Sequence, residues 1–431
     1  MIARPGGRIF RIAAIQIALL LLLAGCSGGS DTTPAPVLVD TLDPYVMSAG
    51  SRAAIQPVVT STSSSILLNC LVLLRETQGC DFNTLPLLGM ETSNPSIDDI
   101  MARVLVSHDW MGTRFREVLE RMPPEMLLMA RGLTGIVISY DIRPSHYQPY
   151  SGAIYLDPEG LWLTAAEAAV IDPTPDFRSD FSSELQFTFL RRYVESNIDL
   201  RSQPRSIDAI SFRTAALLYH ELAHANDFFA PDRIDVVVRT VPVHVAIAGT
   251  FPSSRLRATY PLLSQIMFGL AGVSFQGDTA TEFQRGLTAQ DVAAEFPTDF
   301  SNDYYNYTTQ YEDLAMVFEE ALMFYSFGVQ RDVAVTQVGE TECSQYVVEW
   351  GQRNRIADPA IKARAMFAIT AVLPELSDQI ALGLESVEPQ IQMQVGVDWC
   401  TNILLSPSNQ TSLVIDTGIE PASVELVIPY Q

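Results

Sequence analysis

One segment of the chain constrains its fold more than any other, because it is apolar and yet carries three polar side chains. Residues 207–229 are predicted to form a helix that is apolar on nearly every face, and positions 220–224 within it read His-Glu-Leu-Ala-His. A helix that is apolar all round is buried in a protein core. Burying two imidazoles and a carboxylate is costly unless each has a partner. The rest of the chain must therefore surround this helix and supply those partners.

The spacing inside this motif is typical of a metal-binding pair. Residues four apart share one helical face, about 6 Å from each other, so His220 and His224 can both reach one Zn²⁺ ion at about 2.0–2.1 Å. Glu221 would lie beside the ion, which suits a general base acting on a metal-activated water. The alternative is two core histidines held by hydrogen bonds and a glutamate in an ion pair, without a metal.

A catalytic zinc ion needs a third protein ligand and an open fourth position. Asp227 follows His224 on the same face but one turn further along, so we expect it to orient the site rather than bind the ion. The other candidates are glutamates later in the chain: Glu282, Glu295, Glu312, Glu319 and Glu320. Glu312 is favoured because residues 312–322 have helical periodicity, and a glutamate on the inner face of a second buried helix has the required geometry.

A tyrosine-rich run at positions 304–307 precedes this second helix. A tyrosine hydroxyl near the metal can stabilise an oxyanion. Ordinary aromatic packing is the alternative, and it applies to most of these tyrosines.

Two short motifs together resemble the gluzincin metallopeptidases, most closely the group of lethal factor and the Pro-Pro endopeptidases. They are positions 220–227, which read His-Glu-Leu-Ala-His-Ala-Asn-Asp, and positions 312–315, which read Glu-Asp-Leu-Ala. The resemblance implies a zincin-like metallopeptidase domain that binds one Zn²⁺ ion per chain. It also implies these roles: His220, His224 and Glu312 as metal ligands, Glu221 as general base, Tyr305 as transition-state stabiliser, and Asp227 close to the site.

The chain departs from that group in two places. His224 and Glu312 are 88 residues apart (312 − 224), which is longer than in that group. Met316 stands where these families often place a second acid. Both departures concern the close family and leave the predicted zinc site unchanged.

The N-terminus has the layout of a secretory signal. Three arginines are followed by an apolar run at 12–23 and by Leu-Ala-Gly before Cys26. This ending resembles a bacterial lipoprotein signal, which implies that residues 1–25 are removed and that Cys26 is lipidated; an ordinary cleaved signal or an uncleaved anchor is the alternative. Residues 26–48 would form a flexible tether. The predicted location is the bacterial cell envelope, at the outer membrane, with membrane attachment through the N-terminal lipid only.

Four further cysteines are expected to form disulfides, because their number is even and this compartment is oxidising. Proximity in the sequence favours the pairs Cys70–Cys80 and Cys343–Cys400.

The remaining pattern predicts an α+β fold that is mostly helical, with a small early β-sheet. Strands are expected at 135–140 and 152–156, and the second of these is placed at the edge of a substrate cleft. Helices are expected at 97–121, 180–197, 207–229, 262–275, 310–327 and 358–372, and residues 401–431 return to β-like alternation. The expected regions are 49–130, a metallopeptidase-like domain at 131–375, and a C-terminal segment at 376–431.

Charge limits the partners. The chain has 50 acidic and 27 basic residues and a net charge of −23, which argues against binding nucleic acid through a broad basic face. His108 and His146 are expected to lie on the surface or to serve packing.

We therefore predict an envelope-anchored, zinc-dependent peptidase that hydrolyses peptide or protein substrates. The alternatives are a zinc-binding lipoprotein without catalysis, acting in adhesion, scaffolding or binding, and an envelope protein without a metal.

Overall fold

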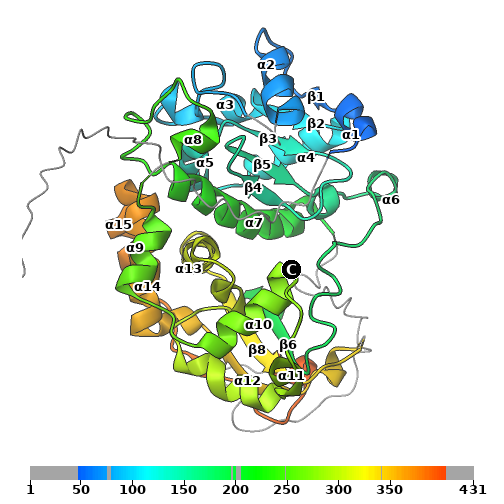
Figure 1. Ribbon diagram of the computed structural model, residues 1–431, viewed down its shortest axis with the longest axis vertical. Helices are drawn as coiled ribbons and strands as arrows, with labels where there is room; N and C mark the ends of the chain where they lie inside the picture. Colours follow the sequence, from blue (N-terminus) through cyan, green and yellow to red (C-terminus); the bar gives the residue numbers. More distant parts are fainter. Residues whose placement is uncertain are drawn as a thin grey trace, which may run out of the picture. The chain divides into compact units, whose positions relative to one another are not determined.

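The computed structural model describes residues 47–74, 79–195, 198–199, 205–247, 249–340 and 342–403 (Figure 1). The signal sequence, Cys26 and the tether up to residue 46 lie outside these residues. So does the alternating pattern after residue 403. The described chain is α+β, as the sequence predicts, but it contains two five-stranded sheets rather than one.

The first sheet has the order β1-β2-β3-β5-β4. Its strands are β1 (Gln56–Pro57), β2 (Val104–Val106), β3 (Gly135–Ile138), β4 (His146–Gln148) and β5 (Ala153–Leu156). The three central strands are parallel and buried along their whole length, whereas β1 and β4 are antiparallel edges. The predicted strand at 152–156 is therefore β5. Because β3 and β4 pair with its two sides, its backbone is not open to pair with a substrate.

The segment predicted as one helix over 97–121 is divided by a strand of this sheet. It forms α3 (Ile97–Met101), then β2, then α4 (Asp109–Leu119). The apolar run at 104–106 is completely buried in the sheet, and this tertiary pairing overrides its helical periodicity. Since β1 pairs with β2 and β2 pairs with β3, the first sheet also joins residues from both sides of the boundary expected at 130/131.

The second sheet is antiparallel throughout and has the order β10-β9-β8-β6-β7. Its strands are β6 (Thr188–Glu195), β7 (Ile198–Asp199), β8 (Gln330–Thr336), β9 (Val348–Arg353) and β10 (Ile391–Gln392). The helix predicted over 180–197 is wrong. Residues 188–194 are rich in aromatic and β-branched side chains that suit a strand, and they pair along their whole length with β8.

The helices around the motif are predicted well. They are α7 (Ile207–Phe228), α10 (Gln265–Gln276), α13 (Gln310–Phe327) and α14 (Pro359–Val372). Side chains of Ser206, Thr309 and Asp358 accept backbone hydrogen bonds at the starts of α7, α13 and α14. α7 packs against α13, and it also contacts α4, α5 and the edge strand β4 (Figure 1).

The other α-helices are short. They are α1 (Ala49–Ala54), α2 (Ser64–Leu68), α5 (Pro124–Met129), α6 (Ala165–Ala168), α8 (Val243–Ala246), α9 (Pro252–Thr259), α11 (Glu282–Gly286), α12 (Ala289–Glu295), α15 (Ser377–Leu384) and α16 (Trp399–Ile403). In the part of the chain that the structure describes, no individual helix combines the length and apolarity needed to cross a membrane. Helices at 359–372 and 374–384, bent by 119° where they meet, reach that threshold only as a pair.

Both expected disulfide pairings are confirmed. Cys70 is bonded to Cys80 and Cys343 to Cys400, with Cα atoms 5.4 Å apart in each pair. The second bond ties α16 to the turn that precedes β9.

One buried carboxyl group on α13 lies apart from the motif. Glu320 is 2% exposed and accepts hydrogen bonds from Asn302 Nδ2 at 2.8 Å and from the backbone N–H of Ile356 at 3.3 Å. Burial raises the pKa of Glu320 to about 7, because it outweighs these hydrogen bonds and the nearby charge of Arg331.

This shift predicts a pH-dependent stability. The folded protein holds the Glu320 proton more tightly than the unfolded chain, whose carboxyl has an ordinary pKa of 4.5. The contribution to the free energy of unfolding is therefore present below pH 4.5 and is lost as the pH rises towards 7. It amounts to at most about 3 kcal/mol. We expect wild-type stability, relative to Glu320→Gln, to fall over this range in urea unfolding. The control variant Glu385→Gln, at an exposed position, retains Glu320 and should follow the wild type. Parallel curves for Glu320→Gln and wild type would contradict the prediction.

Candidate metal centre

Two helices bring the motif residues together. His220 and His224 lie on one face of α7, and Glu312 lies in the first turn of α13. The hydroxyl of Thr309 accepts from the backbone N–H of Glu312 at 3.2 Å, which fixes where α13 begins. Because α7 and α13 pack together, the Glu312 carboxylate meets the two imidazoles. The structure therefore brings together three residues that are separated by up to 92 positions (312 − 220).

The three ligand atoms form a small triangle. His220 Nε2 lies 2.8 Å from Glu312 Oε2, His224 Nε2 lies 3.2 Å from His220 Nε2, and His224 Nε2 lies 3.3 Å from Glu312 Oε2. Ligands held at about 2.0–2.1 Å in a tetrahedron lie about 3.3 Å from one another. The donor set and these distances therefore fit a Zn²⁺ ion. Among the described residues, this is the group of His, Cys, Asp and Glu side chains that converges in this way.

The other third-ligand candidates lie elsewhere. Glu282 is exposed at the start of α11, and Glu295 accepts a hydrogen bond from Ser264 Oγ at 2.5 Å. Glu320 binds Asn302 and the backbone of residue 356. Glu319 reaches His220, but at its other ring nitrogen. Only Glu312 among these five joins the triangle.

Asp227 lies one turn beyond His224 and is completely buried. Its Oδ1 accepts a hydrogen bond of 2.8 Å from the backbone N–H of Ser253, at the N-terminus of α9. Burial raises the pKa of Asp227 to about 6. Asp227 thus holds α9 against the end of the motif helix and does not belong to the metal-ligand triangle.

The charges of the histidines and of the nearby carboxylates shift one another's pKa values. Burial disfavours the charged form of His220, but the carboxylates of Glu312 and Glu319 outweigh it and raise the pKa of His220 to about 10. For Glu312, burial is outweighed by the charges of His224 and His220, and its pKa is lowered. A metal ion would have to displace the proton on His220, so metal uptake should weaken as the pH falls.

Glu319 is a residue whose role the sequence did not reveal. Its Oε2 lies 3.2 Å from His220 Nδ1, while Oε1 accepts from Tyr193 at 2.9 Å and from Arg331 at 3.4 Å. This carboxylate fixes the ring so that Nε2 faces Glu312. Met316 cannot supply a carboxylate, and Glu319, three residues later, is the second acid of α13 that contacts His220. Glu319 follows Glu312 by seven residues, or two helical turns, so the two acids share one face of α13. This spacing is the feature of the sequence that could have revealed the role of Glu319.

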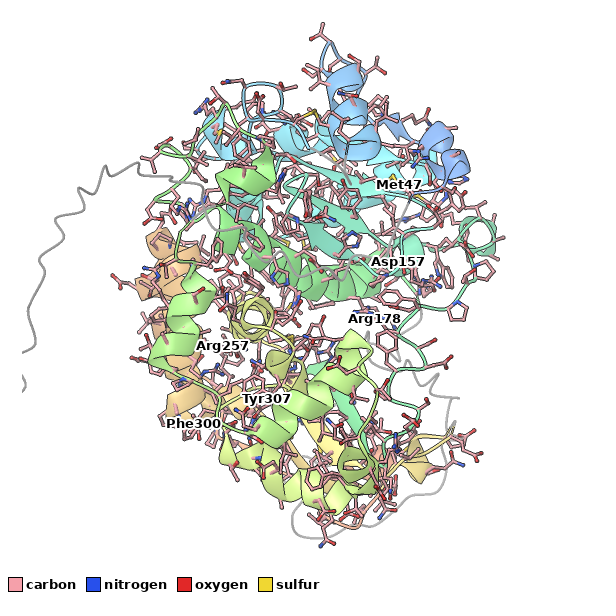
Figure 2. The ribbon with its side chains drawn as sticks, in the orientation of Figure 1. Met47, Asp157, Arg178, Arg257, Phe300 and Tyr307 are labelled. Atoms are coloured by element: carbon pink, nitrogen blue, oxygen red, sulfur yellow. A yellow bond between two sulfur atoms is a disulfide. The ribbon has the colours of Figure 1, made fainter. Side chains whose placement is uncertain are left out.

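Tyr305 lies beside His220 on the 3₁₀ turn η6 (Tyr304–Tyr307). The two ring centroids are 6.1 Å apart, and the backbone N–H of Tyr305 donates to Asp303 at 2.9 Å. Burial raises the pKa of Tyr305, and the positive charges of Arg178, labelled in Figure 2, and Arg191 oppose this only in part. The hydroxyl therefore keeps its proton at neutral pH and can donate a hydrogen bond.

Glu221 is 4% exposed on α7. Within the described chain its carboxylate has no hydrogen-bond partner, yet its charge raises the pKa values of both His220 and Tyr305. It is thus close to the triangle and keeps its oxygens available to accept a proton.

The two remaining histidines of the early region lie outside the triangle. His146 stacks on Tyr155 with ring centroids 5.2 Å apart, and its Nδ1 lies 3.0 Å from the carbonyl of Pro144. His108 contacts Ser107 Oγ at 3.0 Å and packs edge-on against Tyr140. Both have local partners away from the metal-ligand atoms.

No match was found for this chain among protein-family models, curated proteins or solved structures. The geometry of the site therefore carries the functional argument.

Replacing Glu312 tests the third ligand. We expect the purified wild type to bind about one zinc ion per chain and Glu312→Ala to lose most of this affinity, because it removes one of three protein ligands. Glu282→Ala removes an exposed glutamate and serves as the matched control. Atomic absorption after dialysis against zinc measures both variants, and full retention of zinc by Glu312→Ala would exclude this residue as a ligand.

Replacing Glu319 tests the support of His220. Glu319→Gln keeps the shape but removes the charge that holds the imidazole, so zinc affinity should fall roughly 10–100-fold. Competition with a chelator of known affinity measures this, with Glu282→Gln as control. Equal affinities for wild type and Glu319→Gln would show that Glu319 does not position the ring.

Proposed function

We propose that this protein is a zinc-dependent peptidase with a zincin-like fold, attached to the bacterial cell envelope through a lipidated Cys26. The observation that carries the proposal is the triangle of His220, His224 and Glu312. The packing of α7 against both α13 and the first sheet supports the zincin-like part. The sequence resemblance of residues 1–26 to a lipoprotein signal supports the location.

Each side chain around the triangle has a distinct task. His220, His224 and Glu312 would hold the ion, and Glu319 keeps His220 in place. Zinc, when bound, acts as a Lewis acid towards water and the scissile carbonyl. Glu221 takes the proton of the attacking water and passes it to the leaving amine. The Tyr305 hydroxyl donates a hydrogen bond to the carbonyl oxygen as negative charge develops there.

A zinc-binding protein without catalysis is the second candidate. Its ligand triangle would be the same, so the two functions differ in the residues beside it. Binding alone needs neither an unpaired buried carboxylate at Glu221 nor a protonated hydroxyl at Tyr305. Their presence next to the same imidazole favours hydrolysis.

Replacing Glu221 separates these two functions. Glu221→Gln keeps the volume of the side chain and does not touch a ligand, so zinc content should stay at about one ion per chain. Turnover of casein should fall by roughly 10²–10⁴-fold, because the proton acceptor is lost. Unchanged turnover would exclude Glu221 as the base. Absence of turnover in the zinc-loaded wild type, on casein and on mixed fluorogenic peptides, would favour the non-catalytic function.

Replacing Tyr305 tests the oxyanion donor. Tyr305→Phe removes only the hydroxyl, and we expect kcat to fall by roughly 10²–10³-fold with little change in KM. Tyr307→Phe is the matched control, since the Tyr307 hydroxyl donates to Asp299 at 3.1 Å and serves packing. Equal kcat values for the two variants would assign Tyr305 to packing as well.

A further inference from the structure

A cavity of about 250 Å³ follows the edge of strand β6. Phe187 and Phe189 line it and belong to the core on one face of the second sheet. Leu190 and Tyr346 line it as well, but they belong to the core on the opposite face. Because side chains from both faces border one space, the cavity is a groove along the strand edge and not a pocket over one face.

Among the residues that the structure describes, Thr188, Phe189 and Leu190 have a strand partner on one side only. Thr188, Phe189 and Leu190 pair with Thr336, Val335 and Ala334 of β8 on one side. On the other side, the described part of β7 pairs only with residues 194 and 195 of β6. An open strand edge offers backbone groups to which an extended peptide can add as a further strand.

The groove lies close to the metal centre, separated from it by the ring of Tyr305. Arg191, Phe275 and Asp303 belong to its lining. The Phe275 ring lies 4.8 Å from the Tyr305 ring, and the Arg191 guanidinium lies 5.7 Å from the same ring. Tyr305 in turn packs against His220. One aromatic ring therefore separates the groove from the proposed metal.

Size and lining indicate what the groove accepts. Its volume is below the about 300–1,000 Å³ of typical small-molecule sites, and it suits one large side chain with its backbone. Five aromatic rings contribute to the walls: Phe187, Phe189, Phe275, Tyr304 and Tyr346. Such walls favour an aromatic or large aliphatic group through burial and ring packing.

We propose that this groove binds the substrate peptide on one side of the scissile bond. The peptide adds to the edge of β6 and inserts an aromatic or large aliphatic side chain between the two faces of the sheet. The inference rests on the proposed peptidase function and names the substrate class of that site: extended peptides with a large apolar residue near the bond that is cleaved.

Binding to zinc-loaded Glu221→Gln protein tests the groove without turnover. The probe is a short fluorescein-labelled peptide of alternating Ala and Ser with a single Phe, compared with the same peptide carrying Asp. The Phe peptide should bind at least about tenfold more tightly. N-methylation of the backbone beside Phe should weaken binding, because it removes a hydrogen bond to β6. Equal affinities for the Phe and Asp peptides would overturn the proposal.

Blocking variants locate the binding. Ser183 lines the groove and is exposed, so Ser183→Trp in the Glu221→Gln background should remove the preference for Phe. The next residue, Glu184, is exposed but does not line the groove, and Glu184→Trp should bind like the parent. Val338→Trp obstructs the groove from the 338–340 segment and replaces Ser183→Trp if that variant does not fold. Equal binding by blocking and control variants would overturn the proposal.

The outcomes separate the groove from the peptidase function. Cleavage by the wild type with no effect of either blocking variant would overturn the groove and leave the peptidase. Selective peptide binding without cleavage by the wild type would leave a peptide-binding groove and overturn the peptidase. An affinity that falls as the protein concentration rises would assign the groove to a second copy of the chain and overturn the substrate proposal.

Discussion

The contact between His220 on α7 and the two carboxylates of α13 is the interaction on which the rest of the site depends. Glu312 approaches one ring nitrogen at 2.8 Å and Glu319 the other at 3.2 Å. Groups of this kind are costly to bury without partners, so the helices can pack here only while the imidazole and the carboxylates face one another. The contact also fixes the register between the helices, because a shift of one residue on α13 would move both acids off the ring.

This contact extends into the second sheet through arginines. Glu319 meets Arg331 on β8, Arg331 pairs with Asp303, and Asp303 also holds Arg191 and the backbone of Tyr305. A guanidinium can bind several oxygens at once in a fixed plane, which lysine cannot do. The chain has 26 arginines and one lysine, and in this network each arginine bridges two elements. The second sheet therefore positions Tyr305 and supports His220 while contributing no metal ligand.

The sequence predicted the parts of the site that depend on local spacing. Periodicity placed α7, α13 and α14 within a residue or two, and the helical start at Glu312 identified the third member of the triangle. Prediction from the sequence failed for elements whose structure depends on pairing with residues far away in the chain. In β6 the buried Arg192 hid the strand pattern, since its partner Asp332 lies on another strand. Glu319 could be read as a support for His220 only once the facing ring nitrogen was known. The groove beside β6 combines residues that no local spacing connects.

The charges of the network give an independent reason for a divalent cation. Four carboxylates meet around the site: those of Glu221, Asp303 and Glu319 are buried, and that of Glu312 is partly exposed. The arginines that pair with them are Arg191 and Arg331. With neutral histidines the network carries two more negative than positive charges, which is the charge that one Zn²⁺ ion would balance. Without the ion, a proton on His220 offsets one of the two excess negative charges, which agrees with the raised pKa of His220. A proton and a metal ion would then compensate the same excess of negative charge, so the acids that would favour zinc binding are also those that hold His220 charged without it.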